Sequence, residues 1–367
     1  MIYQDFRNLK LSTTPQNIKV NVEYLDLSSN YLSKLPDDFD KYQQLKILFL
    51  SNNNFQSIPK ILSKMTSLYM VSFRNNKISE VNFLPEKLEW LILTNNSINK
   101  IYSIGKLVNL KKLMLSGNML NTLPKDIVNC QKIELLRLSN NQFSKIPECI
   151  FELNNLAWIS MANNPCFPLP NLNKNKDYID VKFIENICQI GEGTAGKVYK
   201  SIFNNNKVAV KHYKSKMTSD GLSTNEMYIL SSIKKHKNLI EIIGYVYNTT
   251  KEDINGIIMP LFDNYNSVGL PPSFETITRD VYNKEIIEPG YIIDQIEKAT
   301  NHLHKNNIIH GDLYSHNIIY NIEKQHAVLT DLGASFKVID KKLLDKFITI
   351  EQRALTIFKN ELLDKFQ

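Results

Sequence analysis

A repeated pattern of apolar residues and asparagines limits what this chain can fold into more than any other feature of its sequence. The pattern runs from Val22 to about Pro165, and its copies follow one another at offsets of about 20 to 23 residues. A unit of this size cannot bury its own apolar face, so the copies must stack around a shared core. The copies begin at Val22, Leu45, Leu68, Leu88, Leu110, Ile133 and, more weakly, Leu156.

The consensus of these copies, L-x-x-L-x-L-x-x-N-x-L, resembles the leucine-rich repeat. In that repeat the L-x-L residues form a short strand, and the Asn amide satisfies backbone groups where the chain leaves the strand. The resemblance implies an α/β leucine-rich-repeat solenoid, a horseshoe of about seven repeats over residues 22–167. Residues 1–21 are expected to form an N-terminal cap, and residues 168–182 a C-terminal cap or linker.

Residues on either side of the central Leu of each predicted strand point out of the core, because side chains alternate across a strand. Many of these residues are apolar, and a contiguous apolar stripe usually marks a binding site. We expect a protein ligand on this concave face, with Trp90 and Trp158 as anchors. The alternative is that the stripe packs on the chain's own second half. The residues expected to contact the ligand are Tyr24, Phe49, Met70, Trp90, Ile92, Met114 and Trp158.

Composition excludes several other classes of protein. The net charge of +7 comes from lysines scattered along the chain, whereas a nucleic-acid site would cluster them. No window is long and apolar enough to span a membrane, and the first residues lack the basic and apolar regions of a signal peptide, so we expect no membrane anchor. The four cysteines lack C-x-x-C spacing and suit a reducing cytosol. We therefore expect a cytoplasmic protein, while delivery into a host cell stays open.

The second half of the chain opens with a glycine-rich stretch, Gly191-Glu192-Gly193-Thr194-Ala195-Gly196. This pattern alone is weak evidence, because dinucleotide-binding folds also contain it. The residues after Gly196, from Val198 to Phe203, indicate a strand, whereas a dinucleotide-binding loop would open a helix. The glycines are therefore expected to form a hairpin lid over nucleotide phosphates.

A strand expected over Val208-Ala209-Val210-Lys211 matches a pattern in which a buried lysine points at the α- and β-phosphates. Such a lysine needs a carboxylate partner. A helix expected over residues 219–234 supplies Glu226 at a suitable spacing. The alternative for Glu226 is a solvated position on an amphipathic helix.

Two short apolar runs bracket the loop that contains Asp312 and Asn317, and a later strand ends in Asp331-Leu332-Gly333. Phosphoryl transfer requires metal-held phosphates, a hydroxyl in line with the phosphate and an acceptor for its proton. Asp312 is expected to orient or deprotonate that hydroxyl, and Asn317 and Asp331 to hold Mg²⁺. Any one of these residues taken alone could equally be a capping or turn residue.

In this order, the motifs from about 183 to 335 resemble those of the protein kinase family. With the repeats in front, the whole chain looks like the bacterial leucine-rich-repeat protein kinases. The resemblance implies an α+β two-lobed domain with an N-lobe at 183–258, a hinge at 259–263 and a C-lobe at 264–367, and it implies ATP and Mg²⁺ as cofactors. The residues expected to bind the nucleotide are Gly191, Glu192, Gly193, Gly196, Val198, Ala209, Lys211, Met259, Pro260 and Phe262.

Three departures from the kinase pattern matter. Gly311 replaces the Arg that usually precedes the catalytic Asp, so a phosphorylated activation loop has no cation to bind there. Tyr314 stands where Ser/Thr kinases place a Lys, and no A-P-E motif follows, so the C-lobe is expected to be truncated. The leading interpretation is an ATP-dependent protein kinase with a Ser or Thr acceptor. The alternatives are a pseudokinase scaffold with little turnover and a small-molecule phosphotransferase.

Overall fold

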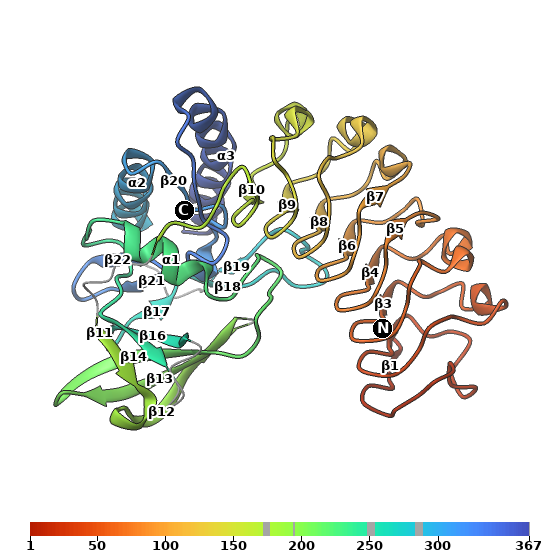
Figure 1. Cartoon of the computed structure of the whole chain (residues 1–367), viewed down its shortest axis with the longest axis horizontal. Helices are drawn as coiled ribbons and strands as arrows, with labels where there is room; N and C mark the ends of the chain where they lie inside the picture. Colours follow the sequence, from red (N-terminus) through yellow and green to blue (C-terminus); the bar gives the residue numbers. More distant parts are fainter. Residues whose placement is uncertain (172–176, 194, 248–253, 283–288, 367) are drawn as a thin grey trace. The chain divides into compact units, whose positions relative to one another are not determined.

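The structure is a computed structural model that describes residues 1–367 apart from 172–176, 194, 248–253, 283–288 and 367 (Figure 1). The chain divides into two compact units. Unit 1 contains Met1–Leu156 and Asn164–Cys166, and unit 2 contains Ala157–Asn163 and Phe167–Gln367. Part of the predicted 168–182 cap or linker, residues 172–176, lies outside the described residues. Among the residues described, no helix has the length and apolar character needed to cross a membrane.

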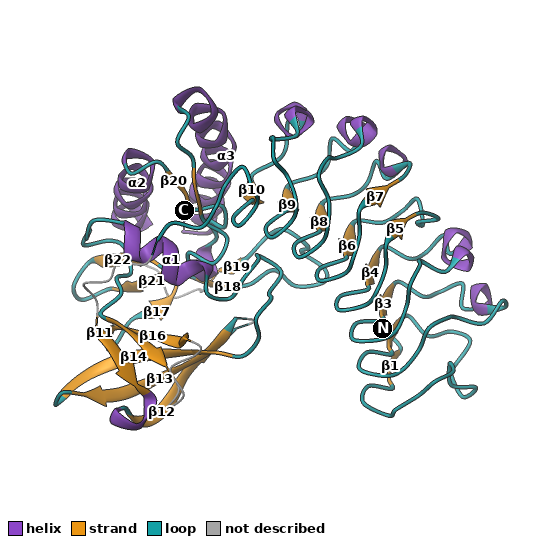
Figure 2. Ribbon diagram, viewed as in Figure 1, coloured by secondary structure: helices purple, strands orange, loops and turns teal. Residues whose placement is uncertain are grey.

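Unit 1 is a stack of short parallel strands, one for each repeat, which confirms the predicted repeat register (Figures 1 and 2). The first strand comes from the predicted N-terminal cap and pairs with the strand of the first repeat. The strands, in sheet order, are β1 (Tyr3–Asp5), β2 (Tyr24–Asp26), β3 (Ile47–Phe49), β4 (Met70–Ser72), β6 (Trp90–Ile92), β8 (Lys112–Met114) and β9 (Leu135–Arg137).

The opposite side of each repeat in unit 1 is formed by short 3-10 helices or by the small β5–β7 pair (Figure 2). The consensus leucines between the two sides are fully buried, as Leu25, Leu48 and Leu91 illustrate. The elements are η1 (Phe39–Lys41), η2 (Lys60–Lys64), β5 (Glu80–Val81), β7 (Lys100–Ile101), η3 (Ile104–Lys106), η4 (Lys125–Asn129) and η5 (Glu148–Glu152).

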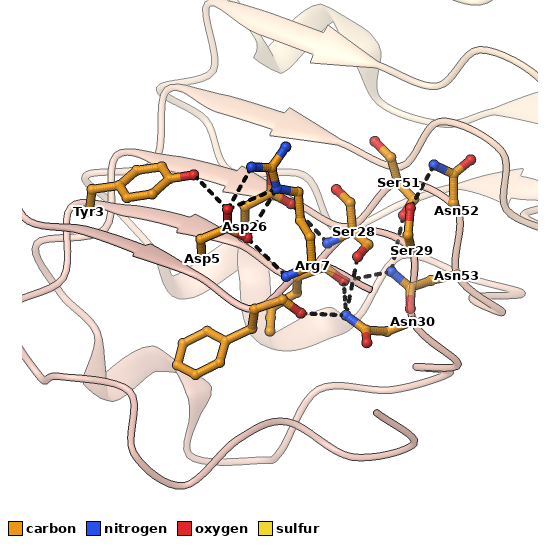
Figure 3. Close-up of polar contacts among 12 residues, drawn as sticks. Tyr3, Asp5, Arg7, Asp26, Ser28, Ser29, Asn30, Ser51, Asn52 and Asn53 are labelled. Carbon is orange, nitrogen blue, oxygen red and sulfur yellow. Dashed lines mark hydrogen bonds and ion pairs between the residues drawn. The ribbon is translucent and has the colours of Figure 1, made fainter. Parts of the chain in front are cut away.

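The consensus asparagines connect neighbouring repeats through their side-chain amides. Asn53 Oδ1 accepts the backbone N–H of Leu32 at 2.9 Å, and its Nδ2 donates to the carbonyls of Leu27 and Leu50 at 3.0 and 3.2 Å. In the first repeat, Asn30 Nδ2 donates to the carbonyl of Ser28 at 3.2 Å (Figure 3). The amide thus satisfies backbone groups that the strand cannot pair, as predicted. The same contacts recur at Asn76, Asn96, Asn118 and Asn141.

Three of the seven residues predicted to contact a protein ligand are buried, so the predicted contact surface is corrected. Met70 lies between Ile47 and Trp90 in the sheet register, and Met114 lies between Ile92 and Arg137, so their flanking neighbours cover them. The residues of the set that keep partial exposure are Tyr24, Phe49, Trp90 and Ile92.

Trp158 is the largest correction. It is only 1% exposed, and it belongs to unit 2, with the strand of the seventh repeat, β10 (Trp158–Ser160). Its ring stacks on that of Tyr314 at a centroid distance of 4.2 Å, and its Nε1–H donates to the carbonyl of Leu313 at 2.9 Å. A side chain held in this way cannot anchor an external ligand.

Unit 2 contains a six-stranded sheet with helix α1 (Asn225–Ser232) and the 3-10 helix η6 (Val181–Phe183). Val210, Val246 and Ile258 are fully buried in its core. Helix α1 begins later than the predicted residue 219, because Gly221 has a φ of +134° and residues 218–221 form a turn. The sheet order is β11 (Asp177–Asp180), β15 (Gly244–Tyr247), β16 (Ile254–Pro260), β14 (Asn206–Tyr213), β13 (Gly196–Phe203) and β12 (Glu185–Glu192).

The rest of unit 2 is built on two long helices, α2 (Pro289–Lys305) and α3 (Lys341–Phe366), with small strand pairs. Only residues 332–340 separate Asp331 from α3. The small elements are β17 (Asn266–Ser267), β18 (Gly269–Leu270), β19 (Val281–Tyr282), β20 (Ile308–Ile309), η7 (Ser315–Asn317), β21 (Ile318–Asn321), β22 (His326–Leu329) and β23 (Phe336–Lys337).

Candidate active site

A buried ion pair joins β14 to helix α1. Lys211 Nζ lies 2.5 Å from Glu226 Oε2 and 3.9 Å from Asp331 Oδ1. Both members of the pair are buried, so the alternative of a solvated Glu226 is wrong. Burial alone would lower the pKa of Lys211, but the carboxylates of Asp331 and Glu226 outweigh it and raise that pKa above its ordinary value. The lysine is therefore a fixed positive charge beside an aspartate.

The loop after β20 brings Asp312 and Asn317 together. Asn317 Nδ2 donates to both the carbonyl and Oδ2 of Asp312, each at 2.9 Å. The buried His310 ring accepts the N–H of Asp312 at Nδ1 and contacts the carbonyl of Thr330 through Nε2 at 3.1 Å. The loop is thus connected to the end of β22, where Asp331 follows. The structure thus brings Asp312 and Asn317 into contact and links their loop to the residue before Asp331.

Asp331 and Asn317 present oxygen atoms suited to a magnesium ion. Asp331 has a φ of +53°, its Oδ1 accepts the N–H of Gly333 at 3.1 Å, and its side chain is 45% exposed. The Asn317 side-chain contacts all use Nδ2, which leaves Oδ1 available as a ligand. Within the described part of the chain no three His, Cys, Asp or Glu residues form a metal cluster. Mg²⁺ takes few protein ligands and completes its shell with phosphates and water, so one carboxylate and one amide oxygen suit it.

The glycine-rich stretch forms the predicted hairpin between β12 and β13. The N–H of Gly193 donates to the carbonyl of Gly196 at 2.9 Å, which closes the turn. A Cβ on Gly196 would lie 2.3 Å from the carbonyl oxygen of His212, so packing requires glycine there. A Cβ on Gly193 would meet no described atom within 4 Å, so that glycine leaves open space beside the backbone. The Glu192 carboxylate pairs with Lys214.

The remaining predicted nucleotide residues lie on adjacent strands. Val198 is opposite Lys211 in the register of β13 and β14, and Gly191 is opposite Val198 in that of β12 and β13. Ala209 is opposite Met259, and Pro260 ends β16. Phe262 follows, and its ring packs edge-on against Tyr265 at 5.1 Å.

Two buried carboxylates that the sequence analysis did not single out hold the Asp312 loop. Asp280 accepts hydrogen bonds from Ser315 Oγ at 2.5 Å and from the N–H of His316 at 3.1 Å. Glu351 accepts the N–H of Gly311 at 2.7 Å. Both come from distant parts of the chain, and no spacing in the sequence connects them with the loop.

Tyr314, at the position where Ser/Thr kinases have a lysine, is buried. Its ring is buried between Trp158, at 4.2 Å, and His316, at 5.1 Å. Burial alone would lower the pKa of His316, but its hydrogen bond to Asp280 and the nearby aspartates raise it above its ordinary value. The histidine therefore carries positive charge beside the loop at a higher pH than an ordinary imidazole.

Comparison with known families agrees with this geometry. Residues 184–356 match the protein kinase domain, and residues 20–78 and 108–165 match the leucine rich repeat. The chain therefore matches the leucine rich repeat in its first part and the protein kinase domain in its second part.

Its relatives include proteins named as serine/threonine-protein kinases. One from Acanthamoeba polyphaga mimivirus is 28% identical over 187 residues, which cover 48% of this chain and 31% of the viral protein. One from Dictyostelium discoideum is 30% identical over 208 residues, which cover 48% of this chain and 16% of that protein. The chain thus spans at most about a third of these relatives. They are viral and amoebal, and a bacterial origin stays a prediction.

Among solved structures, a leucine-rich-repeat protein of Leptospira interrogans aligns with a TM-score of 0.32 and 25% identity, over 44% of this chain and 60% of that one.

Proposed function

We propose that this protein is an ATP-dependent protein kinase that transfers the γ-phosphoryl group to a Ser or Thr hydroxyl, and that its repeats recruit the protein partner. The observation that carries the proposal is the buried Lys211–Glu226 pair with Asp331 at 3.9 Å. A buried ion pair is costly unless it is well compensated, so it is weak evidence for stability alone. Here the pair holds the Lys211 ammonium group beside the half-exposed carboxylate of Asp331. A nucleotide phosphate needs such a fixed positive charge, and its metal ion needs such a carboxylate.

Each residue of the site has a role in this proposal. Lys211 binds the α- and β-phosphates, and Glu226 holds it in place. Asn317 Oδ1 and Asp331 are the ligands for Mg²⁺, which supplies positive charge to the phosphates when bound. Asp312 orients the acceptor hydroxyl and takes its proton, and its carboxylate is fixed for that task by Asn317 Nδ2.

The hairpin of β12 and β13 covers the phosphates in this proposal. Val198, Ala209 and Met259 contact the adenine, and the backbone near Pro260 and Phe262 supplies its hydrogen bonds. The domain has two lobes joined at residues 259–263, with the sheet of unit 2 as the N-lobe and helices α2 and α3 in the C-lobe.

The ligand surface of the repeats is proposed to be the exposed part of the predicted stripe. Three aromatic rings form one row there: Tyr3 and Tyr24 at 4.5 Å, and Tyr24 and Phe49 at 5.6 Å. Rigid aromatic side chains are the common anchors of protein interfaces. A cytoplasmic site of action also belongs to the proposal, since all four cysteines are unpaired.

A second candidate is a scaffold with little turnover, and the burial of Tyr314 favours it. The lysine that steadies the transferred phosphate in Ser/Thr kinases has no counterpart at this position, and the tyrosine that replaces it is packed between two rings. Transition-state charge then depends on Lys211 and the metal.

Labelled ATP separates the candidates. The full chain is incubated with γ-labelled ATP, Mg²⁺ and generic protein acceptors, beside the Asp331→Ala variant. Label on Ser or Thr that disappears in the variant supports the kinase. ATP binding without transfer supports the scaffold, and label only on added small molecules supports a metabolite phosphotransferase.

A further inference from the structure

The strand of the seventh repeat contacts the loop that carries Asp312. We infer that residues 157–163 are a built-in support of this loop, in which Trp158 and Ile159 act as positioning residues. The inference rests on the proposed kinase function for its effect on catalysis. Its structural part, that the strand orders the loop, stands independently of activity.

Two hydrogen bonds connect the strand with the loop, one on each side of Asp312. The N–H of Ile159 donates to the carbonyl of Gly311 at 3.1 Å. The Nε1–H of Trp158 donates to the carbonyl of Leu313 at 2.9 Å. Both carbonyls that flank Asp312 in the sequence are therefore fixed by the same strand, which limits the rotation of the backbone at Asp312.

The approach of the strand explains the glycine at position 311. Gly311 has a φ of +76°, which only glycine adopts readily. A Cβ at this position would lie 2.2 Å from the carbonyl oxygen of Ile159 and 3.1 Å from that of Ala334. The arginine that kinases usually carry here cannot fit beside the strand. The strand can lie beside residue 311 only because that residue is glycine and not arginine.

Aromatic packing holds both the strand and the chain that follows it. The ring of Trp158 is nearly parallel to that of Tyr314, at 9°, and the guanidinium of Arg279 lies 5.7 Å from the Trp158 ring centroid. Phe167 packs on Phe336 and Phe347 at 5.2 and 5.8 Å. The strand is therefore anchored as part of the kinase core.

This arrangement gives the loop an order that does not depend on phosphorylation. In kinases with the arginine, a phosphate on the activation segment orders the site through that cation. Here the segment from Asp331 to α3 is short, and the strand occupies the space beside residue 311. The loop is expected to be formed in the unphosphorylated protein.

A conservative variant tests the strand's role in the full chain. Trp158→Phe keeps a six-membered ring that can stack on Tyr314, but it removes the five-membered ring of the indole together with its Nε1–H donor. It is expected to lower kcat about tenfold or more and change the KM for ATP less than about twofold. Tyr31→Phe, which changes an exposed aromatic residue of the repeats outside the predicted ligand surface, is the control and should keep the wild-type kcat. A wild-type kcat in Trp158→Phe would overturn the inference.

For Gly311→Arg, the kinase pattern alone predicts retained transfer, whereas the contact with the strand predicts its loss. It restores the usual arginine, yet it should abolish transfer because the side chain collides with Ile159. Gly311→Arg with retained or raised kcat would contradict the inference.

Hydrogen exchange distinguishes a failure of this inference from a failure of the kinase proposal. Peptides covering residues 308–318 should exchange faster in Trp158→Phe than in the wild type or in Tyr31→Phe, whether or not the protein transfers phosphate. Unchanged exchange there would show that the strand does not order the loop.

Discussion

Asp280 binds His316 twice: its Oδ1 lies 2.9 Å from the imidazole Nδ1, and its Oδ2 accepts the His316 backbone N–H at 3.1 Å. The same Oδ2 accepts Ser315 Oγ. The carboxylate is almost fully buried and comes from the residue before β19. The turn that ends at Asn317 is therefore shaped by a distant segment, and the orientation of a proposed metal ligand depends on it.

Removal of the Asp280 carboxylate is expected to weaken metal use. Asp280→Ala leaves three buried donors without an acceptor, so Asn317 should shift, kcat should fall about 10- to 100-fold and the KM for Mg²⁺ should rise. Asp280→Asn retains one oxygen acceptor and should recover part of the loss. Asp294→Asn, at an exposed pair on α2, is the control and should behave like the wild type. Equal activity in all three variants would show that Asp280 has no positioning role.

The raised pKa of His316 predicts how stability depends on pH. Burial opposes the charge, but Asp280, Asp312 and Asp331 stabilise it, so the folded-state pKa lies above the unfolded value. The stabilisation is fully present below about pH 6.5 and is lost as pH rises through the folded-state pKa. The wild type should therefore exceed His316→Gln in unfolding free energy by more at about pH 5.5 than at about pH 9, on the order of 1 kcal/mol. Urea titrations in EDTA measure this difference, and an advantage that grows with pH contradicts it.

Glu351 is expected to be important for stability. Its carboxylate accepts the N–H of Gly311 and pairs with His304 Nε2, each at 2.7 Å, in a buried site on α3. Glu351→Ala removes the acceptor of the Gly311 N–H and of His304 Nε2 and should lower the unfolding free energy by about 2 to 4 kcal/mol. Glu323→Ala, at an exposed residue, should change it by less than about 0.5 kcal/mol. If Glu351→Ala lowers the unfolding free energy as little as Glu323→Ala does, Glu351 does not stabilise the loop that carries Asp312.

A consensus asparagine should stabilise the repeats far more than a surface one. Asn118 accepts the N–H of Ile98 at 3.0 Å and donates to the carbonyls of Leu93 and Leu115 at 3.0 and 2.8 Å. Asn118→Ala should lower the unfolding free energy by about 2 kcal/mol or more, because buried backbone groups lose their partners. Asn99→Ala, at an exposed position of the neighbouring repeat, should have little effect. Chemical denaturation measures the unfolding free energy of both variants. A loss in Asn118→Ala no larger than that in Asn99→Ala would contradict the role of the consensus asparagine.

The features that could be predicted from the sequence are those with a local pattern. The repeat register follows from one spacing of Leu and Asn, and the central residue of each repeat strand is buried. Lys211, Glu226, Asp312, Asn317 and Asp331 each stand at the spacing that a strand, helix or loop of a kinase imposes. The structure places Lys211 against Glu226 and Asp331, and Asn317 against Asp312.

The features that could not be predicted are contacts between distant segments. Trp158 has the same place in its repeat as Trp90, so the pattern assigned both to one exposed face, and only tertiary packing distinguishes them. Asp280 and Glu351 carry no local signature, because a buried carboxylate is recognised only when its donors are known. The late start of α1 depends on the backbone of Gly221, which no periodicity reports.

The most direct test of the kinase proposal is the rate of phosphoryl transfer by Asp312→Asn, measured beside its affinity for ATP. The amide keeps the shape of the side chain but cannot take a proton from the acceptor. The proposal predicts transfer to Ser or Thr by the wild type, a loss of about 10²-fold or more in kcat for the variant, and an ATP dissociation constant within about twofold of the wild type. Transfer at the wild-type rate in Asp312→Asn would contradict the assignment of Asp312 as the catalytic base.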